Sequence, residues 1–168
     1  MDVYSAAKAK IPIRIGVRGA PVTVWSILSH PIKSGPILLV DDDVNDISLT
    51  LRALDRNHLK NAVIVVRDGI EALEYLFEAG KYAGQTTILP EIVLLDLDLP
   101  KVGGLKLLGL LRAAERTRAL PVIVLTSSAD EQDRIDTHNL GTISYLRKPI
   151  NVKNLCEAVS RCGLRKAA

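Results

Sequence analysis

The sequence predicts a doubly wound α/β fold, in which helices cover both faces of a single sheet of five parallel strands. Short apolar runs alternate with helix-like stretches five times after residue 36. Those runs are continuous rather than alternating, as expected for parallel strands buried on both faces. A chain of 168 residues, of which 48% are hydrophobic and 24% charged, can bury the core of such a domain.

The apolar runs define the predicted strands, and the stretches between them the predicted helices. The strands are expected at 37–40, 62–66, 92–95, 121–125 and 143–146. Helical spacing of apolar residues follows the first strand, at Val44, Ile47, Leu51 and Leu54. The last helix is expected from about Asn151 to Cys162.

Polar residues predict where three of the helices begin. Asp43 is the third of three consecutive acids, and because a helix N-terminus favours a carboxylate, we expect it to cap the first helix. Asp68 with Glu71 has the spacing of a capping box, and so has Ser128 with Glu131. We expect both pairs to start helices.

Residues 1–34 differ from the rest of the chain. They hold five of the 22 basic residues, one of the 19 acidic residues and three prolines, without sustained periodicity. We expect a disordered or artefactual tail at 1–34, a folded domain at 35–164 and a short tail at 165–168. The remaining charges nearly balance, which does not favour nucleic-acid binding. No apolar run has the roughly 18 residues that a membrane span needs.

Cys156 and Cys162 both fall in the last predicted helix. Six helical residues span ~9 Å along the axis, beyond the ~7 Å that a disulfide bridges. We therefore expect two free thiols and a reducing, cytoplasmic location.

Most of the chemically unusual residues follow the predicted strands, at their carboxyl ends. They are Asp41 and Asp42 after the first strand, Asp96 at the third, Thr126 at the fourth and Lys148 after the fifth. In an open α/β sheet those ends share one edge, and ligands bind there. We therefore expect residues that are distant in sequence to meet in one pocket.

The residue types in that pocket suit phosphoryl transfer. Three neighbouring carboxylates repel one another, and Mg²⁺, which prefers a few carboxylates and several waters, relieves that repulsion. Lys148 offers a positive charge to a phosphate, and Thr126 offers a hydroxyl donor. A carboxylate nucleophile, a metal and a clamp on the transferred group are the parts that this chemistry needs.

In their motifs, these residues resemble the receiver domains of two-component response regulators. The matching segments are 39–42, 94–100, Gly104, 125–126 and 145–149, within a region from 37 to about 164. The resemblance implies a flavodoxin-like sheet of order 2-1-3-4-5. It also implies a single-domain signalling protein that accepts a phosphoryl group from a histidine kinase and catalyses only its own phosphorylation and dephosphorylation.

The resemblance also implies roles for the acidic residues. Asp96 is the expected phosphoacceptor. Asp42 is expected to bind Mg²⁺ directly, Asp41 through water, and the backbone carbonyl of Asp98 as the third protein ligand. Asp98 and Ser128 stand at variable positions that the family links to phosphoryl lifetime, and the acid at Asp98 departs from the commoner residues there.

Further features follow from the same resemblance. Lys148 is expected to contact the phosphoryl group, and Thr126 to turn toward it on activation. Tyr145 matches the aromatic switch residue, and the Lys148–Pro149 bond is expected to be cis. Phosphorylation is then expected to change the face built from the fourth helix, fifth strand and fifth helix.

Within the family, the chain is most similar to small stand-alone regulators paired with phytochrome-type histidine kinases. Segments 76–80, 97–101 and 125–130 and the long loop at 80–90 carry this similarity. The expected partner is such a kinase, with a homodimer left open. No nucleic acid or membrane partner is expected.

Three alternatives remain to be weighed. A haloacid-dehalogenase-type phosphohydrolase also uses an Asp-x-Asp pair, as at 96–98, but it carries its nucleophile on the first strand and an acidic pair after the lysine. A degenerate receiver would lack part of the acid, threonine and lysine set. A DNA-binding regulator would need a helix-turn-helix region, for which the residues after the last helix leave no room.

Overall fold

The computed structural model describes residues 35–56, 59 and 61–163 of the chain. The predicted tails at 1–34 and 165–168, and residue 164, therefore lie outside the described residues. Within the described part, five strands and five α-helices alternate along the chain, as predicted.

The strands form one parallel sheet in the order β2-β1-β3-β4-β5, which confirms the predicted topology. Their bounds are β1 Ile37–Val40, β2 Val63–Val66, β3 Ile92–Asp96, β4 Val122–Thr126 and β5 Ser144–Arg147. The helices are α1 Val44–Arg56, α2 Gly69–Leu76, α3 Gly104–Ala113, α4 Glu131–Asn139 and α5 Val152–Arg161, and a short 3-10 helix, η2, spans Gly80–Tyr82.

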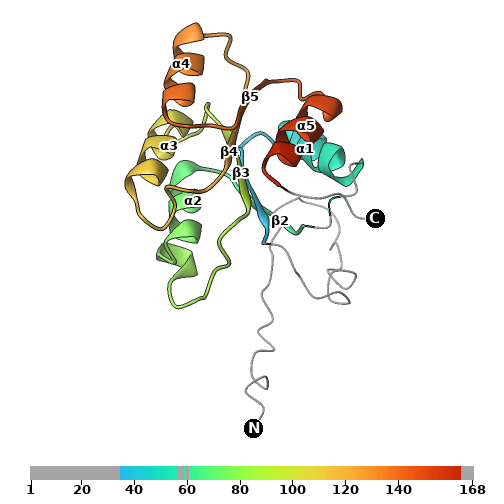
Figure 1. The fold of residues 1–168 in the computed structure, drawn as a ribbon. Coiled ribbons are helices and arrows are strands. Elements are labelled where there is room, and N and C mark those ends of the chain that lie inside the picture. The colour runs from blue at the N-terminus through green and yellow to red at the C-terminus, as the bar shows by residue number, and fades with distance from the viewer. Residues whose placement is uncertain (1–34, 57–58, 60, 164–168) are drawn as a thin grey trace.

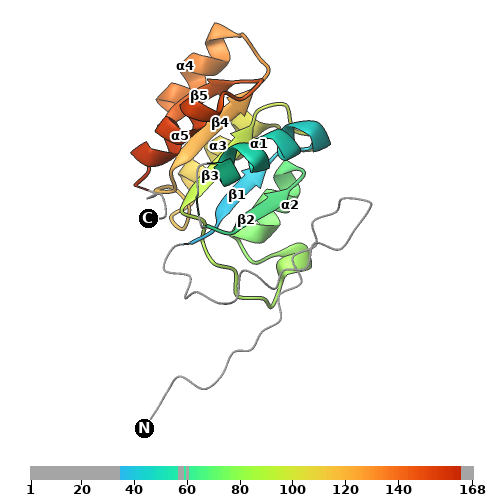
Figure 2. The ribbon, with the colours of Figure 1, turned by 90° about the vertical axis from the view of Figure 1, so that its right-hand side faces the viewer.

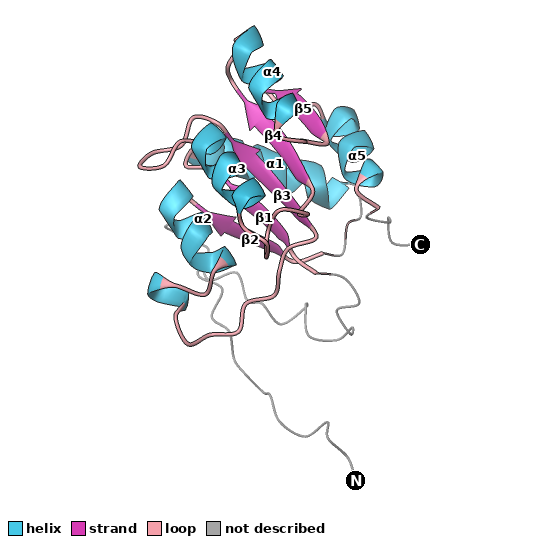
Figure 3. Cartoon of the chain, turned by 60° about the vertical axis from the view of Figure 1, so that its left-hand side comes forward, coloured by secondary structure: helices cyan, strands magenta, loops and turns pink. Residues whose placement is uncertain are grey.

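The helices cover both faces of the sheet. Figure 1 shows α1 and α5 on one face and α2, α3 and α4 on the other. Figure 2 brings α1 and α5 in front of the sheet, and Figure 3 brings α2, α3 and α4 forward. None of the helices in the described ranges is long and apolar enough to cross a membrane.

Two apolar cores lie on the two faces, which explains why the strands are apolar throughout. In β1, Leu38 and Val40 pack with α2 and α3, whereas Ile37 and Leu39 pack with α1 and α5. All four side chains are fully buried. Because successive side chains of a strand point to opposite faces, a sheet covered on both sides needs apolar residues at every position.

The helix starts agree with prediction at two of three sites. The Asp43 carboxylate accepts hydrogen bonds from the backbone N–H groups of Asn45 and Asp46 at the start of α1. Asp68 caps α2 by accepting from the N–H of Glu71, and Glu71 in turn accepts from the N–H of Arg67. Each carboxylate thus satisfies N–H groups that the first helical turn leaves without partners.

The predicted cap at Ser128 is wrong. α4 begins at Glu131, and its cap is Asp130, whose side chain accepts from the N–H of Gln132. The Ser128 hydroxyl instead accepts from the N–H of Asp130 and organises the turn before the helix. The segment contains two residues able to cap, and the chain path after β4 places the later one at the helix start.

Candidate functional site

The register of the sheet places two buried acids side by side at its carboxyl edge. Val40 pairs with Leu95 across β1 and β3, so Asp41, which directly follows β1, lies beside Asp96, the last residue of β3. Asp41 is fully buried and Asp96 is 3% exposed. Two carboxylates are therefore held close together in a region with little water.

The Lys148 ammonium group lies between these acids. Its Nζ atom is 2.8 Å from Asp41 Oδ2 and 2.9 Å from Asp96 Oδ2. A third carboxylate, from Asp46 on α1, lies 2.8 Å from the same nitrogen. The Lys148 side chain is only 7% exposed, and its peptide bond to Pro149 is cis, as expected.

The pKa values of the buried groups reflect this arrangement. Burial raises the pKa of Asp41, although the hydrogen bond from Lys148 opposes the rise. Burial alone would lower the pKa of Lys148, but hydrogen bonds to Asp41, Asp46 and Asp96 raise it above its ordinary value. Lys148 therefore stays charged and screens the acids from each other.

Three carboxylates at this edge fit a divalent cation. Oxygen atoms of Asp41, Asp42 and Asp96 lie within 4.8 Å of one another. Asp42 is exposed, whereas the other two are buried, so the cluster opens to solvent on the Asp42 side. A set of oxygen ligands with an open side suits a hard cation that keeps several waters.

Backbone N–H groups hold two of these carboxylates in place. The N–H of Asp43 donates to Asp41 Oδ1 at 3.0 Å, and the N–H of Asp98 donates to Asp96 Oδ1 at 3.2 Å. The Asp98 side chain is exposed. The loops after β1 and β3 thus orient the acids through main-chain contacts.

Thr126 is the last residue of β4, and Tyr145 lies on the neighbouring strand β5. Thr126 is fully buried, and its Oγ1 accepts from the N–H of Ser128 at 3.0 Å. The Tyr145 hydroxyl donates to the Ser128 carbonyl at 3.3 Å. Burial raises the pKa of Tyr145, and a hydrogen bond with Thr126 opposes this rise. The two predicted switch residues are therefore linked through Ser128.

The structure thus brings the predicted acids and Lys148 together and adds Asp46, which sequence reasoning missed. The sequence does contain a signal for Asp46. Asp46 lies in the first turn of the helix that follows Asp41 and Asp42, so its turn begins at the sheet edge where Lys148 lies. Sequence reasoning treated that turn only as a helix start.

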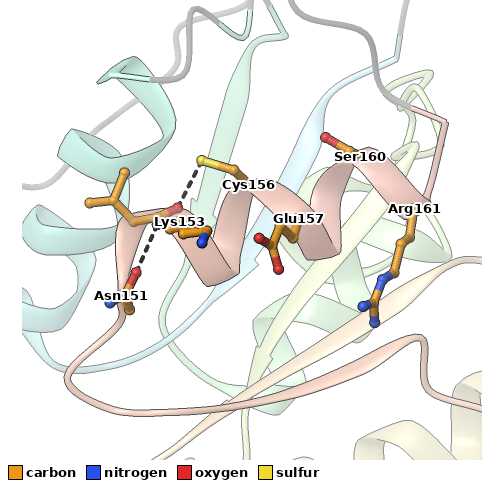
Figure 4. Close-up of a pocket in the computed structure, with 7 residues that line it drawn as sticks. Asn151, Lys153, Cys156, Glu157, Ser160 and Arg161 are labelled. Carbon is orange, nitrogen blue, oxygen red and sulfur yellow. Dashed lines mark hydrogen bonds between the residues drawn. The ribbon is translucent and has the colours of Figure 1, made fainter.

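A separate shallow pocket lies on α5 and holds none of these residues. Figure 4 shows that its lining side chains come from that one helix and its cap. Asn151 accepts from the N–H of Lys153, and the Cys156 thiol donates to the Val152 carbonyl. These contacts satisfy the helix locally, so the aspartate cluster is the better candidate site.

Comparison with known proteins identifies the family to which this chain belongs. Residues 37–160 match the response regulator receiver domain family. The chain belongs to this family, and it is a response regulator receiver domain of two-component systems.

The similar proteins include response regulators of phytochromes. The bacteriophytochrome response regulator RtBRR shares 44% identity, with a TM-score of 0.73 over 80% of this chain and 81% of that one. Response regulator Rcp1 of Synechocystis sp. is 35% identical over 131 residues, which cover 78% of this chain and 86% of the relative. The Mn²⁺-bound form of Rcp1 has a TM-score of 0.67 at 32% identity, over 80% of this chain and 97% of that one.

Proposed function

We propose that this protein receives a phosphoryl group on Asp96 from a sensor histidine kinase, with Mg²⁺ bound, and signals through contacts with other proteins. The observation that carries the proposal is the Lys148 ammonium group 2.9 Å from the Asp96 carboxylate, beside a cluster of metal-binding acids. Phosphoryl transfer depends mainly on positioning and on neutralising charge, and this arrangement supplies both.

In the proposed step, a carboxylate oxygen of Asp96 forms a bond to the phosphorus of a phosphohistidine on the kinase. The phosphorus–nitrogen bond breaks, and its electron pair leaves with the imidazole ring. Lys148 balances charge on the phosphoryl oxygens as they reach the buried site. Apart from this transfer and the later hydrolysis of the acyl phosphate, no catalytic activity is proposed.

The residues present fit a magnesium ion. Asp42 and Asp96 would bind it directly, Asp41 through water, and Asp98 through its backbone carbonyl. The cation would neutralise the acids and the incoming phosphoryl oxygens. The Mn²⁺ in the related Rcp1 structure supports a divalent ion in this family, and Mg²⁺ is our proposal for this chain.

The proposed partner is a phytochrome-type histidine kinase in the cytoplasm. Similarity to the bacteriophytochrome response regulator RtBRR and to Rcp1 supports this choice. We also propose that residues 35–164 form the complete receiver unit and that residues 1–34 are dispensable for phosphorylation. Signalling would proceed through protein contacts, either in a homodimer or with a separate target, and not through nucleic acid.

Labelling with a small phosphoryl donor tests the proposed function. Wild-type protein treated with acetyl phosphate and Mg²⁺ should gain a base-labile phosphoryl group on Asp96, located by mass spectrometry. Asp96→Asn should gain none, whereas Asp98→Asn should still be labelled because it retains the acceptor. Asp42→Ala should bind Mg²⁺ more weakly than wild type. Equal labelling of Asp96→Asn, or unchanged Mg²⁺ affinity in Asp42→Ala, would contradict the proposal.

A further inference from the structure

Asp46 is a fourth carboxylate at the site, and it contacts the lysine rather than the metal cluster. Its Oδ2 lies 2.8 Å from Lys148 Nζ, a distance equal to that of the buried Asp41. A lysine ammonium has three N–H donors and no acceptor. Asp41 and Asp96 each accept a hydrogen bond from Lys148, and Asp46 forms an ion pair with the same nitrogen atom.

The three acids differ in what else they can bind. Asp41 and Asp96 belong to the cluster that fits a divalent cation, and Asp46 does not. A cation at that cluster would interact with Asp41 and Asp96, the same two carboxylates that bind Lys148. Once it binds, Asp46 is the one partner of Lys148, among the three ion pairs described, that lies outside the cluster.

The position of Asp46 is itself well defined. Its N–H donates at 2.9 Å to the Asp43 carboxylate, which caps α1. Its side chain is 30% exposed, so it reaches the buried ammonium from the rim of the site. The Asp46 carboxylate is therefore held by a rigid helical turn, whereas the Lys148 ammonium group lies at the end of a flexible four-carbon side chain.

We propose that Asp46 is a positioning residue for Lys148, holding its ammonium group by this ion pair so that the charge stays beside Asp96 while the metal ion and the phosphoryl group bind. The inference rests on the proposed function of Asp96 as phosphoacceptor. Without Asp46, Lys148 keeps its charge but loses its anchor outside the metal cluster. Small losses of position can cost much of the rate of a transfer that depends on orientation.

The first test compares phosphorylation kinetics of wild type and Asp46→Asn over a range of acetyl phosphate concentrations. The maximal rate should fall about tenfold, equivalent to ~1.4 kcal/mol of barrier height. Mg²⁺ affinity, measured by calorimetry, should change by less than about threefold, since Asp46 is no ligand and exposed charges are screened. A wild-type rate, or a parallel large loss of Mg²⁺ affinity, would overturn the proposal.

Two variants separate positioning from simple loss of charge or of folding. Asp43→Asn removes a carboxylate from the same turn, but its amide oxygen can still cap the helix, so its rate should match that of wild type. Asp46→Glu restores a carboxylate to the same position and should recover most of the lost rate. If Asp43→Asn is as slow as Asp46→Asn, or if Asp46→Glu stays equally slow, Asp46 does not act by holding Lys148.

A spectroscopic measurement decides the contact without phosphoryl transfer. In ¹⁵N-labelled wild-type protein, the Lys148 ammonium signal should be visible, because the group is buried among three carboxylates and its protons exchange slowly with water. In Asp46→Asn the ammonium protons of Lys148 should exchange faster with water, which broadens the signal. An unchanged signal would refute the contact between Asp46 and Lys148. Failure of wild-type protein to accept phosphate on Asp96 would contradict the proposed function, whereas this signal would still report on Asp46.

Discussion

Gly104 packs directly against the backbone of Asp96. A Cβ on residue 104 would collide with the carbonyl oxygen of Asp96 and the Cα of Leu97. The N–H of Gly104 also donates to the Leu97 carbonyl at 3.0 Å, which ties the start of α3 to the loop after β3. The absence of a side chain at residue 104 thus lets α3 approach the proposed phosphoacceptor.

Gly104→Ala should therefore disturb both stability and phosphorylation. The backbone contact has no flexible side chain to yield, so we expect a loss of about 2 kcal/mol in the free energy of unfolding and slower labelling of Asp96. Gly109→Ala, in the same helix but with open space around its Cβ, should stabilise the protein by about 0.5–1 kcal/mol. Urea denaturation of both variants checks this, and equal effects would contradict the role of the contact.

Lys148→Met should destabilise the metal-free protein. It leaves Asp41 and Asp96 buried without their cation, and loss of one partner of a buried ion pair typically costs about 3–5 kcal/mol. Saturating Mg²⁺ should stabilise this variant more than wild type, because the cation then replaces the missing positive charge. Thermal unfolding with and without Mg²⁺ measures both effects. If Mg²⁺ stabilises the variant less than it stabilises wild type, Lys148 does not neutralise the charge of Asp41 and Asp96.

Thr50→Val should stabilise the protein. Thr50 is fully buried in α1, and its hydroxyl is the one buried side-chain polar atom in the described residues without a hydrogen-bond partner. Replacing it by an isosteric methyl group should add about 1 kcal/mol to the free energy of unfolding.

Thr117→Val is the matched control for this substitution. Thr117 is equally buried, but its hydroxyl donates to the Leu111 carbonyl at 2.8 Å, so the same change should cost about 1 kcal/mol. Chemical denaturation compares the two variants, and changes of the same sign would refute the explanation.

The Cys162 thiol should resist alkylation at pH 8. Burial raises its pKa from 9.0 to about 11, so the thiolate is scarce in the folded protein. Because the folded pKa is the higher one, the associated stability is present below about pH 9 and is lost as the pH rises toward 11. Iodoacetamide labelling at Cys162 should be about 100-fold slower in native than in urea-unfolded protein. Equal rates would contradict the raised pKa.

Tyr145→Ala should uncouple phosphorylation from output. The Tyr145 hydroxyl and the Thr126 side chain both bond to Ser128, so a movement of Thr126 toward Asp96 would release that linkage. In beryllofluoride-treated wild type, we expect NMR shifts across α4, β5 and α5. In the variant they should stay near Asp96, and partner binding should no longer respond. Shifts confined to the Asp96 loops in wild type would exclude this switch.

The sequence by itself determined the five strands, their shared edge and most of the site. A strand buried on both faces must be apolar throughout, so the five strands could be recognised in the sequence as continuous apolar runs. Polar residues that end such runs must collect where parallel strands end. Asp41, Asp42, Asp96 and Lys148 were found in this way. The strand order and the assignment of chemical roles, above all to Asp98 and Tyr145, needed the family resemblance in addition.

Tertiary structure alone decided which residues begin the helices and which helical residues join the acids and Lys148 at the site. The signal for a capping residue is local, and Ser128 and Asp130 are both residue types that can cap a helix, so only the path of the chain after β4 selected Asp130. Likewise, the first turn of α1 places Asp46 near the sheet edge, but it does not show that Asp46 meets a lysine 102 positions later. Local patterns report what a residue does within its own element, whereas a contact between elements depends on how helices and loops pack over the sheet.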